Sequence, residues 1–458
     1  MVLKNILPRI KDVEVKEFRC SKSIESIYAD FQDKTHTAFL KTGKIIAGHR
    51  LSVIGRDPFL MFESKGEDIV LHGISIWRTK GDPFALLQRV IEHYGGSGLL
   101  LDIPFPVGAI GAFSYDLKEV LENIPSLCCD SIGCCDMHFS FFREWIIMDE
   151  REGKFFEVNV VTEDSGRCPG GIVEERNPGE TVLGTLASNF TEEEYKEAVR
   201  RVRKNIKEGT IYQANISQQF SVEFQGDSFR LFKMLNKINP APMSAYLDWG
   251  KCKLISSSPE RFLLKKGRHV ESRPVKGTRP RGMDKAGDSR LKQELIESGK
   301  DSAELAMIVD LVRNDLGKTA GQGTVRVQSP KVIEEYTNVF HSLAVVTSCL
   351  REEVAPLELV RSCFPGGSIT GCPKVQAMKV IEEIEKDKRG FYCGSIGYIG
   401  FNGDLDLSIA IRTFIERNNN LYFNLGGGIV YDSDSQEEYD ETMHKGETMF
   451  QVLKEIYF

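Results

Sequence analysis

Lys276 is the first residue of this sequence whose type and setting could do covalent chemistry. It lies in the segment Arg-Pro-Val-Lys-Gly-Thr, residues 273–278, and the following Gly277 lets another group approach the backbone closely. A lysine amine becomes a nucleophile when burial or neighbouring positive charge favours its neutral form. The alternative is a solvated loop lysine, since lysines are mostly exposed and Arg279 and Arg281 follow close by.

Three glutamates could bind a cation. Glu304 lies on a predicted helix and shares a face with the apolar Ile308, where a carboxylate needs a partner or a cation. Glu438 and Glu441 are three residues apart on another predicted helix, so they project from one side of it. Carboxylate oxygens of this kind suit Mg²⁺. The alternative is that these acidic side chains belong to a solvated surface.

Two glycine-rich loops and three polar side chains complete the candidates. Backbone N–H groups in the loops 366–371 and 426–428 could contact an anion, although turn geometry alone would also explain these glycines. Arg412 interrupts an apolar strand, where a guanidinium needs a carboxylate from the protein or from a substrate. Glu260 could be an acid–base group or a turn residue, and His341 a catalyst or a satisfied core histidine.

Composition narrows the class of protein. The chain has 458 residues, enough for two or three domains, and a net charge of −7 that argues against a general nucleic-acid-binding protein. No apolar run is long enough to span a bilayer, and the first residues do not form a signal-peptide core. The cysteines lack the spacing of a zinc site. We therefore expect a cytoplasmic protein with reduced cysteines and without a nucleic-acid or membrane partner.

The chain is expected to form two α+β regions. A stretch rich in Gly, Pro and charge at 163–190 predicts a linker or long exposed loop. It separates an N-terminal region, residues 1–162, from a C-terminal region, residues 191–458, which would contain the catalytic site. The N-terminal region is expected to be β-rich over 36–80, with a helix at 83–95.

In the C-terminal region, strand-like stretches alternate with amphipathic helices. The capping box Thr191-Glu-Glu-Glu194 predicts the start of a helix that ends near Gly209. The last strands are joined by short turns such as Asn402-Gly403, which favours antiparallel hairpins over a parallel sheet. Further strands are expected at 211–224, 253–257, 391–401, 407–415 and 421–431, and helices at 302–317, 374–386 and 436–456.

Five motifs follow one another along the C-terminal region. They are Ser258-Pro-Glu-Arg-Phe, Arg273-Pro-Val-Lys-Gly-Thr-Arg-Pro-Arg-Gly, Asp310-Leu-Val-Arg-Asn-Asp, Gly367-Ser-Ile-Thr-Gly-Cys-Pro-Lys and Gly403-Asp-Leu-Asp. In this order they closely resemble the motifs of the chorismate-utilising enzymes. The resemblance covers about residues 190–455, and the N-terminal region shares it through Pro106-Val-Gly-Ala-Ile-Gly-Ala-Phe-Ser-Tyr-Asp. Several long motifs in register are far more specific than any single one.

The resemblance implies a fold and a set of ligand-binding residues. The fold is α+β, with two orthogonally packed antiparallel β-sheets flanked by helices. The metal ion is Mg²⁺, and its carboxylates fall on Glu304 and Glu441, with Glu438 close by. The contacts to chorismate fall on Gly277, Thr278, Thr370, Tyr392, Arg412, Gly426, Gly427, Gly428 and Lys445.

The resemblance also implies which reaction is catalysed. The family's acid at the C4 oxygen falls on Glu260, and a histidine near the reacting ring falls on His341, which Asp310 could orient. Members that form isochorismate have a water-activating lysine where this chain has Gln213, whose amide is no base. Members that form anthranilate typically have alanine in place of Lys276, whereas those that form aminodeoxychorismate have lysine. In these, the amine attacks C2 as the C4 hydroxyl leaves, and ammonia then displaces it by attacking C4.

The source of ammonia is expected to be a second protein. The chain shows no glutaminase signature with a nucleophilic cysteine and its triad. The resemblance therefore implies a separate glutamine amidotransferase subunit and a role in 4-aminobenzoate and folate biosynthesis. Two alternatives stay open, namely a family member that forms anthranilate for tryptophan biosynthesis and a catalytically silent subunit that binds an amino acid. Retention of Lys276, Glu260 and the three glutamates disfavours the silent subunit.

Overall fold

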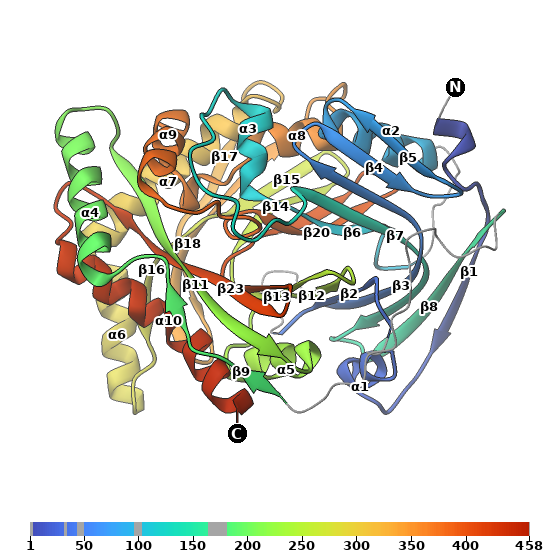
Figure 1. The fold of residues 1–458 in the computed structure, drawn as a ribbon, viewed down its shortest axis with the longest axis horizontal. Helices are drawn as coiled ribbons and strands as arrows, with labels where there is room; N and C mark the ends of the chain where they lie inside the picture. The colour runs from blue at the N-terminus through green and yellow to red at the C-terminus, as the bar shows by residue number, and fades with distance from the viewer. Residues whose placement is uncertain (1–2, 32–33, 44–49, 96–102, 164–180, 458) are drawn as a thin grey trace.

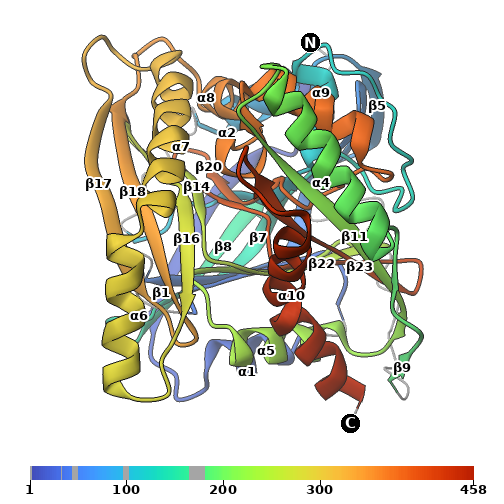
Figure 2. The ribbon, with the colours of Figure 1, turned by 90° about the vertical axis from the view of Figure 1, so that its left-hand side faces the viewer.

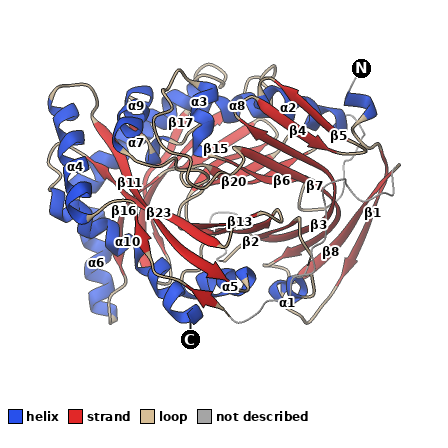
Figure 3. Ribbon diagram, viewed as in Figure 1, coloured by secondary structure: helices blue, strands red, loops and turns tan. Residues whose placement is uncertain are grey.

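The fold is an antiparallel β structure covered by helices. The computed structural model describes residues 3–31, 34–43, 50–95, 103–163 and 181–457. Their strands pair antiparallel and are joined by hydrogen bonds into one continuous network. Figure 1 shows the strands in two layers that face each other, and Figure 3 shows the helices on the outside. The predicted fold class, antiparallel sheets flanked by helices, is confirmed.

The N-terminal region is β-rich, as its sequence predicts. The helix expected at 83–95 is α2, and its inner face buries Leu87, Val90 and Ile91 among other apolar side chains. The two longest strands of this region, β3 and β7, pair along most of their length. The bounds are β1 Ile10–Phe18, α1 Ile24–Ala29, β2 Thr37–Lys41, β3 Leu51–Lys65, β4 Asp68–His72, β5 Ile76–Lys80, α2 Pro83–Gly95, β6 Gly108–Phe113, α3 Lys118–Leu121, β7 Met137–Asp149 and β8 Lys154–Thr162.

In the C-terminal region, the first long helix begins and ends where its sequence predicts. Thr191 and Glu194 form the expected capping box, because each side chain accepts a hydrogen bond from the other residue's backbone N–H. Gly209 follows the helix with a φ of 78°. The helices are α4 Glu192–Lys207, α5 Ser228–Ile238, α6 Lys285–Glu297, α7 Gly299–Gly317, α8 Pro356–Cys363, α9 Lys374–Ile384 and α10 Ser435–Tyr457.

Two of the strands predicted in the C-terminal region differ from the observed ones, and β12 and β14 to β18 lie where no strand was predicted. The strand expected at 407–415 is broken into β21 and β22 because Arg412 has a φ of 50°, which does not fit a β-strand. The strand expected at 391–401 begins only at Ser395, after Cys393 with a φ of 63°. The strands are β9 Val182–Leu183, β10 Ala187–Ser188, β11 Gln213–Gln225, β12 Met243–Asp248, β13 Cys252–Ser258, β14 Arg261–Lys266, β15 His269–Arg273, β16 Val275–Pro280, β17 Arg326–Glu335, β18 Val339–Cys349, β19 Gly371–Cys372, β20 Ser395–Gly400, β21 Leu405–Ile409, β22 Thr413–Arg417 and β23 Asn420–Ile429.

The two regions of the chain share sheets and a hydrophobic core. Strand β2 of the N-terminal region pairs with β12, and β6 pairs with β20. One core cluster includes side chains from both regions, such as Phe105, whose ring centroid lies 4.6 Å from that of Tyr398. Within the linker expected at 163–190, residues 164–180 lie outside the described residues. The residues that follow them form the short strands β9 and β10 beside β11.

Candidate active site

Strand β23 brings the predicted site residues together. It pairs with β11, so its glycines 426–428 lie opposite residues 215–217. Helix α10 packs against β23, and Figure 2 faces the side of the molecule on which β16, β11 and α10 lie. A Cβ atom at Gly428 would be 2.3 Å from Gln213 Nε2 and 3.1 Å from Lys276 Nζ. Glycine at this position therefore leaves space that is bordered by the amide and the amine.

Charged groups of α10 border the neighbouring glycine. A Cβ atom at Gly427 would be 3.1 Å from Glu438 Oε2, 3.8 Å from Lys445 Nζ and 4.0 Å from Glu441 Oε1. The structure thus places these three side chains and the pair of Lys276 and Gln213 around one short stretch of β23. Sequence analysis assigned these residues to one site, and their geometry is consistent with that assignment.

Lys276 is held by an irregular part of β16. The register of β16 against β18 shifts between Val275 and Thr278, and Gly277 has a φ of 87°. Such bulges re-aim side chains and are frequent next to active sites. Burial lowers the pKa of the Lys276 amine, and the positive charge of Lys445 lowers it further, against the opposing effect of Glu304. This environment favours the neutral amine that a nucleophile requires.

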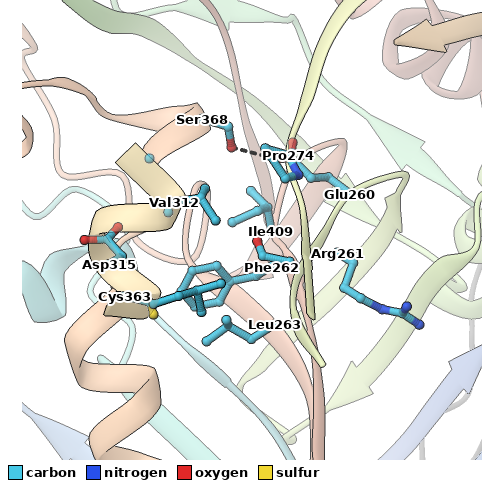
Figure 4. Close-up of a pocket in the computed structure, with 14 residues that line it drawn as sticks. Glu260, Arg261, Phe262, Leu263, Pro274, Val312, Asp315, Cys363, Ser368 and Ile409 are labelled. Atoms are coloured by element: carbon cyan, nitrogen blue, oxygen red, sulfur yellow. Dashed lines mark hydrogen bonds between the residues drawn. The ribbon is translucent and has the colours of Figure 1, made fainter. Parts of the chain in front are cut away.

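Glu260 is a buried acid with one well-defined hydrogen-bond donor. The residue is 4% exposed and follows β13 directly. Its Oε1 accepts a hydrogen bond from Ser368 Oγ at 2.5 Å (Figure 4) and another from the backbone N–H of Val275 at 3.4 Å. Burial raises the pKa of Glu260 to about 7, although these two donors and Lys276 oppose the rise. A carboxyl group with this pKa can both donate and accept a proton near neutral pH.

His341 is a buried neutral imidazole. Its Nδ1 lies 2.9 Å from the hydroxyl of Thr278, and its Nε2 has no hydrogen-bond partner among the described residues. Burial lowers the pKa of His341 to about 3, and Arg412 contributes to the same shift. The expectation that Asp310 orients this histidine is wrong. The side chain of Asp310 is 78% exposed and pairs with Arg313, because it lies on the outer face of α7.

Arg412 projects from the break between β21 and β22. Its guanidinium donates a hydrogen bond to Asn239 Oδ1 at 3.0 Å, and burial lowers its pKa. Among the residues that the structure describes, no carboxylate forms an ion pair with it. A partly buried guanidinium without a carboxylate partner fits a site for an anionic substrate group.

Two of the three predicted metal carboxylates, Glu438 and Glu441, lie on α10 and differ in their surroundings. Glu438 is 5% exposed, accepts a hydrogen bond from Ser433, and has its pKa raised by burial and then by the charge of Glu441. Glu441 forms an ion pair with Lys445 at 2.6 Å. Two adjacent carboxylates, one of them buried, suit a hard cation that would cancel their repulsion. Within the described part of the chain, however, no three such ligands already converge on one point.

Two predicted substrate contacts are engaged within the protein. The hydroxyl of Thr370 is buried and donates a hydrogen bond to the carbonyl of Gly366 at 2.9 Å. The ring of Tyr392 is buried, and the guanidinium of Arg389 lies 5.9 Å from its centroid. Neither side chain lies beside the glycines of β23 in the contacts described above. Their roles as substrate contacts remain predictions.

Two residues that shape the site, Ser368 and Arg389, were not predicted from the sequence. Ser368 belongs to the motif Gly367-Ser-Ile-Thr-Gly-Cys-Pro-Lys, but no pattern of residue types indicated that its hydroxyl would contact Glu260. Arg389 is 1% exposed and pairs with Glu385, and it donates to the backbone carbonyls of Asn215 and Ile369. It thereby connects β11 to the loop that carries Ser368. The Glu-x-x-x-Arg spacing of this pair was the only available signal.

Comparisons with known proteins identify the family. The model of a family described as chorismate binding enzyme matches residues 48–451. Aminodeoxychorismate synthase component 1 of Escherichia coli (strain K12) is 36% identical over 413 residues, covering 89% of this chain and 90% of that protein. Anthranilate synthase component 1 of Aquifex aeolicus (strain VF5) is 35% identical over 409 residues, covering 83% and 81%. A crystal structure of anthranilate synthase component I from Streptococcus pneumoniae TIGR4 gives a TM-score of 0.76 at 30% identity, covering 88% of this chain and 93% of that chain.

The buried Glu260 and the charged side chains beside the glycines of β23 are compatible with the binding of a small anionic molecule. The chain belongs to the family of chorismate binding enzymes, and it is a chorismate-utilising enzyme. Among the described residues, no helix has the length and apolar character needed to cross a membrane.

Proposed function

We propose that this protein converts chorismate and ammonia to 4-amino-4-deoxychorismate, as component I of an aminodeoxychorismate synthase. The observation that carries the proposal is the half-buried Lys276, whose amine lies with Gln213 at Gly428. An amine with a lowered pKa supports a nucleophilic role. The amide of Gln213 cannot activate water, which disfavours hydroxylation. The relative in Escherichia coli carries the proposed name and supports the same reading.

Lys276 as the nucleophile and Glu260 as the acid are suited to a two-step displacement. Neutral Lys276 forms a bond to C2 of chorismate, the two ring double bonds shift, and the C4–O bond breaks. Glu260 gives its proton to the departing hydroxyl, which leaves as water. Ammonia then forms a bond to C4, the two double bonds shift back, the C2–nitrogen bond breaks, and Lys276 is released. Glu260, now a carboxylate, accepts a proton from the incoming nitrogen, so chorismate and ammonia give the amino product and water.

The anionic substrate requires positive charge. Glu304, Glu438 and Glu441 would hold Mg²⁺, which when bound would neutralise and orient the ring carboxylate of chorismate. Arg412, with no carboxylate partner of its own among the described residues, would bind a carboxylate of the substrate. We expect removal of divalent cations to abolish chorismate consumption and added Mg²⁺ to restore it.

The proposed activity is tested by the mass of the product. The purified chain would be incubated with chorismate, Mg²⁺ and ammonium salt, and the products analysed by mass spectrometry. We expect the mass of aminodeoxychorismate. Formation of anthranilate would instead assign the chain to the other synthase, whose name a relative of similar identity carries. No consumption of chorismate would favour the catalytically silent subunit.

A glutamine amidotransferase partner is proposed as the source of ammonia. The name of the relative in Escherichia coli, component 1, is consistent with a second subunit. We expect the isolated chain to use ammonia but not glutamine, and to gain glutamine-dependent activity when a cognate amidotransferase is added. Full glutamine-dependent turnover by the pure chain would contradict this part of the proposal.

A further inference from the structure

Ser368 forms a hydrogen bond with Glu260, the proposed acid. It lies in the short 3₁₀ segment Gly367–Ile369, between α8 and α9, and it is buried. Its Oγ is 2.5 Å from Glu260 Oε1, and Figure 4 shows its side chain directed at that residue. The N–H of Val275 donates to the same carboxyl oxygen. Two donors on Oε1 leave Oε2 as the oxygen that can carry a proton.

We propose that Ser368 is a positioning residue, whose hydroxyl fixes Glu260 so that its Oε2 faces the reacting C4 oxygen. The same hydroxyl stabilises the carboxylate that remains on Glu260 after proton transfer. This inference rests on the proposed function. In the first step, the Oε2–H bond breaks and the proton passes to the C4 hydroxyl as the C4–O bond breaks. The Ser368 hydrogen bond strengthens as negative charge develops on Glu260, so it lowers the barrier of this step.

The surroundings of Glu260 make this hydrogen bond important. The cavity beside it is lined mainly by apolar side chains, including Phe262 and Ile409, and a hydrogen bond is stronger in such a medium. Four other charged or polar groups lie on the elements around Glu260. Lys276 of β16 and Cys393 before β20 interact with it electrostatically. Asp315 of α7 forms ion pairs with Lys374 and Lys318, and Arg261 forms ion pairs with Glu271 and Asp406 (Figure 4).

Among the described residues, Ser368 is the one side chain that donates a hydrogen bond to Glu260. Because this bond favours the ionised carboxyl, its loss raises the pKa of Glu260 further above its usual range. The variant Ser368→Ala then keeps its acid protonated to higher pH than the wild type. Ser368→Thr retains the hydroxyl and is expected to behave as the wild type.

The test is the rate of chorismate consumption with ammonia, measured for each variant from pH 6 to pH 9. Dividing the variant rate by the wild-type rate at each pH cancels the titration of ammonia itself. We expect Ser368→Ala to lower kcat about tenfold at pH 6 with little change in KM for chorismate, and the ratio to rise about tenfold towards pH 9. Ser368→Thr should give a flat ratio near one.

Ser395→Ala is the matched control, because this buried serine on β20 donates to the backbone carbonyl of Ser408 and does not contact Glu260. Its ratio should be independent of pH even if the variant is less stable. A pH-independent ratio for Ser368→Ala would overturn the inference, as would full activity of this variant at every pH. The mass of the wild-type product tests the proposed function separately, so the two ideas can fail independently.

Discussion

At the residue scale, burial shifts the pKa values of the two proposed reacting groups in opposite directions and favours the neutral form of each. It raises the pKa of Glu260 to about 7 and lowers that of Lys276, because a charge is costly to bury whatever its sign. A protonated acid and a free amine are the forms that the first step of the proposed reaction needs. Burial therefore favours the form of the acid and the form of the nucleophile that this step requires.

Replacing Lys276 tests its role as the nucleophile. We expect Lys276→Ala to lower formation of aminodeoxychorismate by more than about 10³-fold, because the covalent route is lost. Some anthranilate is the expected residual product. Lys276→Arg serves as the control for charge, since a guanidinium stays protonated and cannot attack, and it should be equally inactive. Product analysis by mass spectrometry would decide, and unchanged output from Lys276→Ala would exclude the nucleophilic role.

Ionised Glu260 is expected to lower the free energy of unfolding, although the proposed reaction requires this residue. Because its pKa is raised from 4.5 in the free side chain to about 7 in the folded protein, its contribution to stability is full below pH 4.5 and is lost as the pH rises through 7. Ionising it costs the folded state about 3 kcal/mol. Glu260→Gln should therefore unfold at a higher temperature than the wild type at pH 8, with little difference near pH 4.5, while its activity is lost. Identical pH dependence of the two melting temperatures would contradict this reading.

At the scale of single elements, Gly426 and Gly428 of β23 are surrounded by different groups, so replacing them should have different effects. A Cβ atom at Gly426 would lie 2.4 Å from the backbone carbonyl oxygen of Ile216, whereas the atoms nearest to one at Gly428 belong to the ends of the Gln213 and Lys276 side chains. Gly426→Ala should therefore destabilise the fold by about 1–3 kcal/mol, because β11 must move. Gly428→Ala should keep near-native stability and lose about 10²-fold in kcat/KM, because it displaces the reacting groups. Thermal melts and chorismate consumption would separate the two, and full activity in Gly428→Ala would contradict the site.

The elements that could be predicted from sequence are those with local signals. Helix α4 was predicted at both ends because Thr191, Glu194 and Gly209 act within one turn of it. The break at Arg412 was not predicted, since its left-handed backbone is imposed by tertiary contacts and not by residue type. Ser368 was missed for a similar reason. Its partner Glu260 is 108 positions away in the chain, and only the fold brings the two together.

At the scale of the whole molecule, the linker predicted at 163–190 divides the chain into two regions, but strand pairing and a shared core join these regions in the fold. The pairings β2–β12 and β6–β20 continue the sheets from one region into the other. The rings of Tyr94 and Phe401 lie 5.1 Å apart across this boundary, and the buried Lys118 forms an ion pair with Glu382 at 3.0 Å. Separation of the two regions would expose strand edges and core side chains together, which is costly and promotes aggregation.

These contacts predict that cutting the chain at 163–190 will not separate its two regions. A specific protease site would be placed there, and the cleaved protein examined by size-exclusion chromatography and by chorismate consumption. We expect both fragments to elute together at the mass of the intact chain and to keep its activity, because the shared sheets and core hold them. The fragments 1–162 and 191–458 expressed alone should be insoluble, since each leaves the paired edges of β2, β6, β12 and β20 open. Elution of two separately folded fragments would show instead that the regions are independent domains.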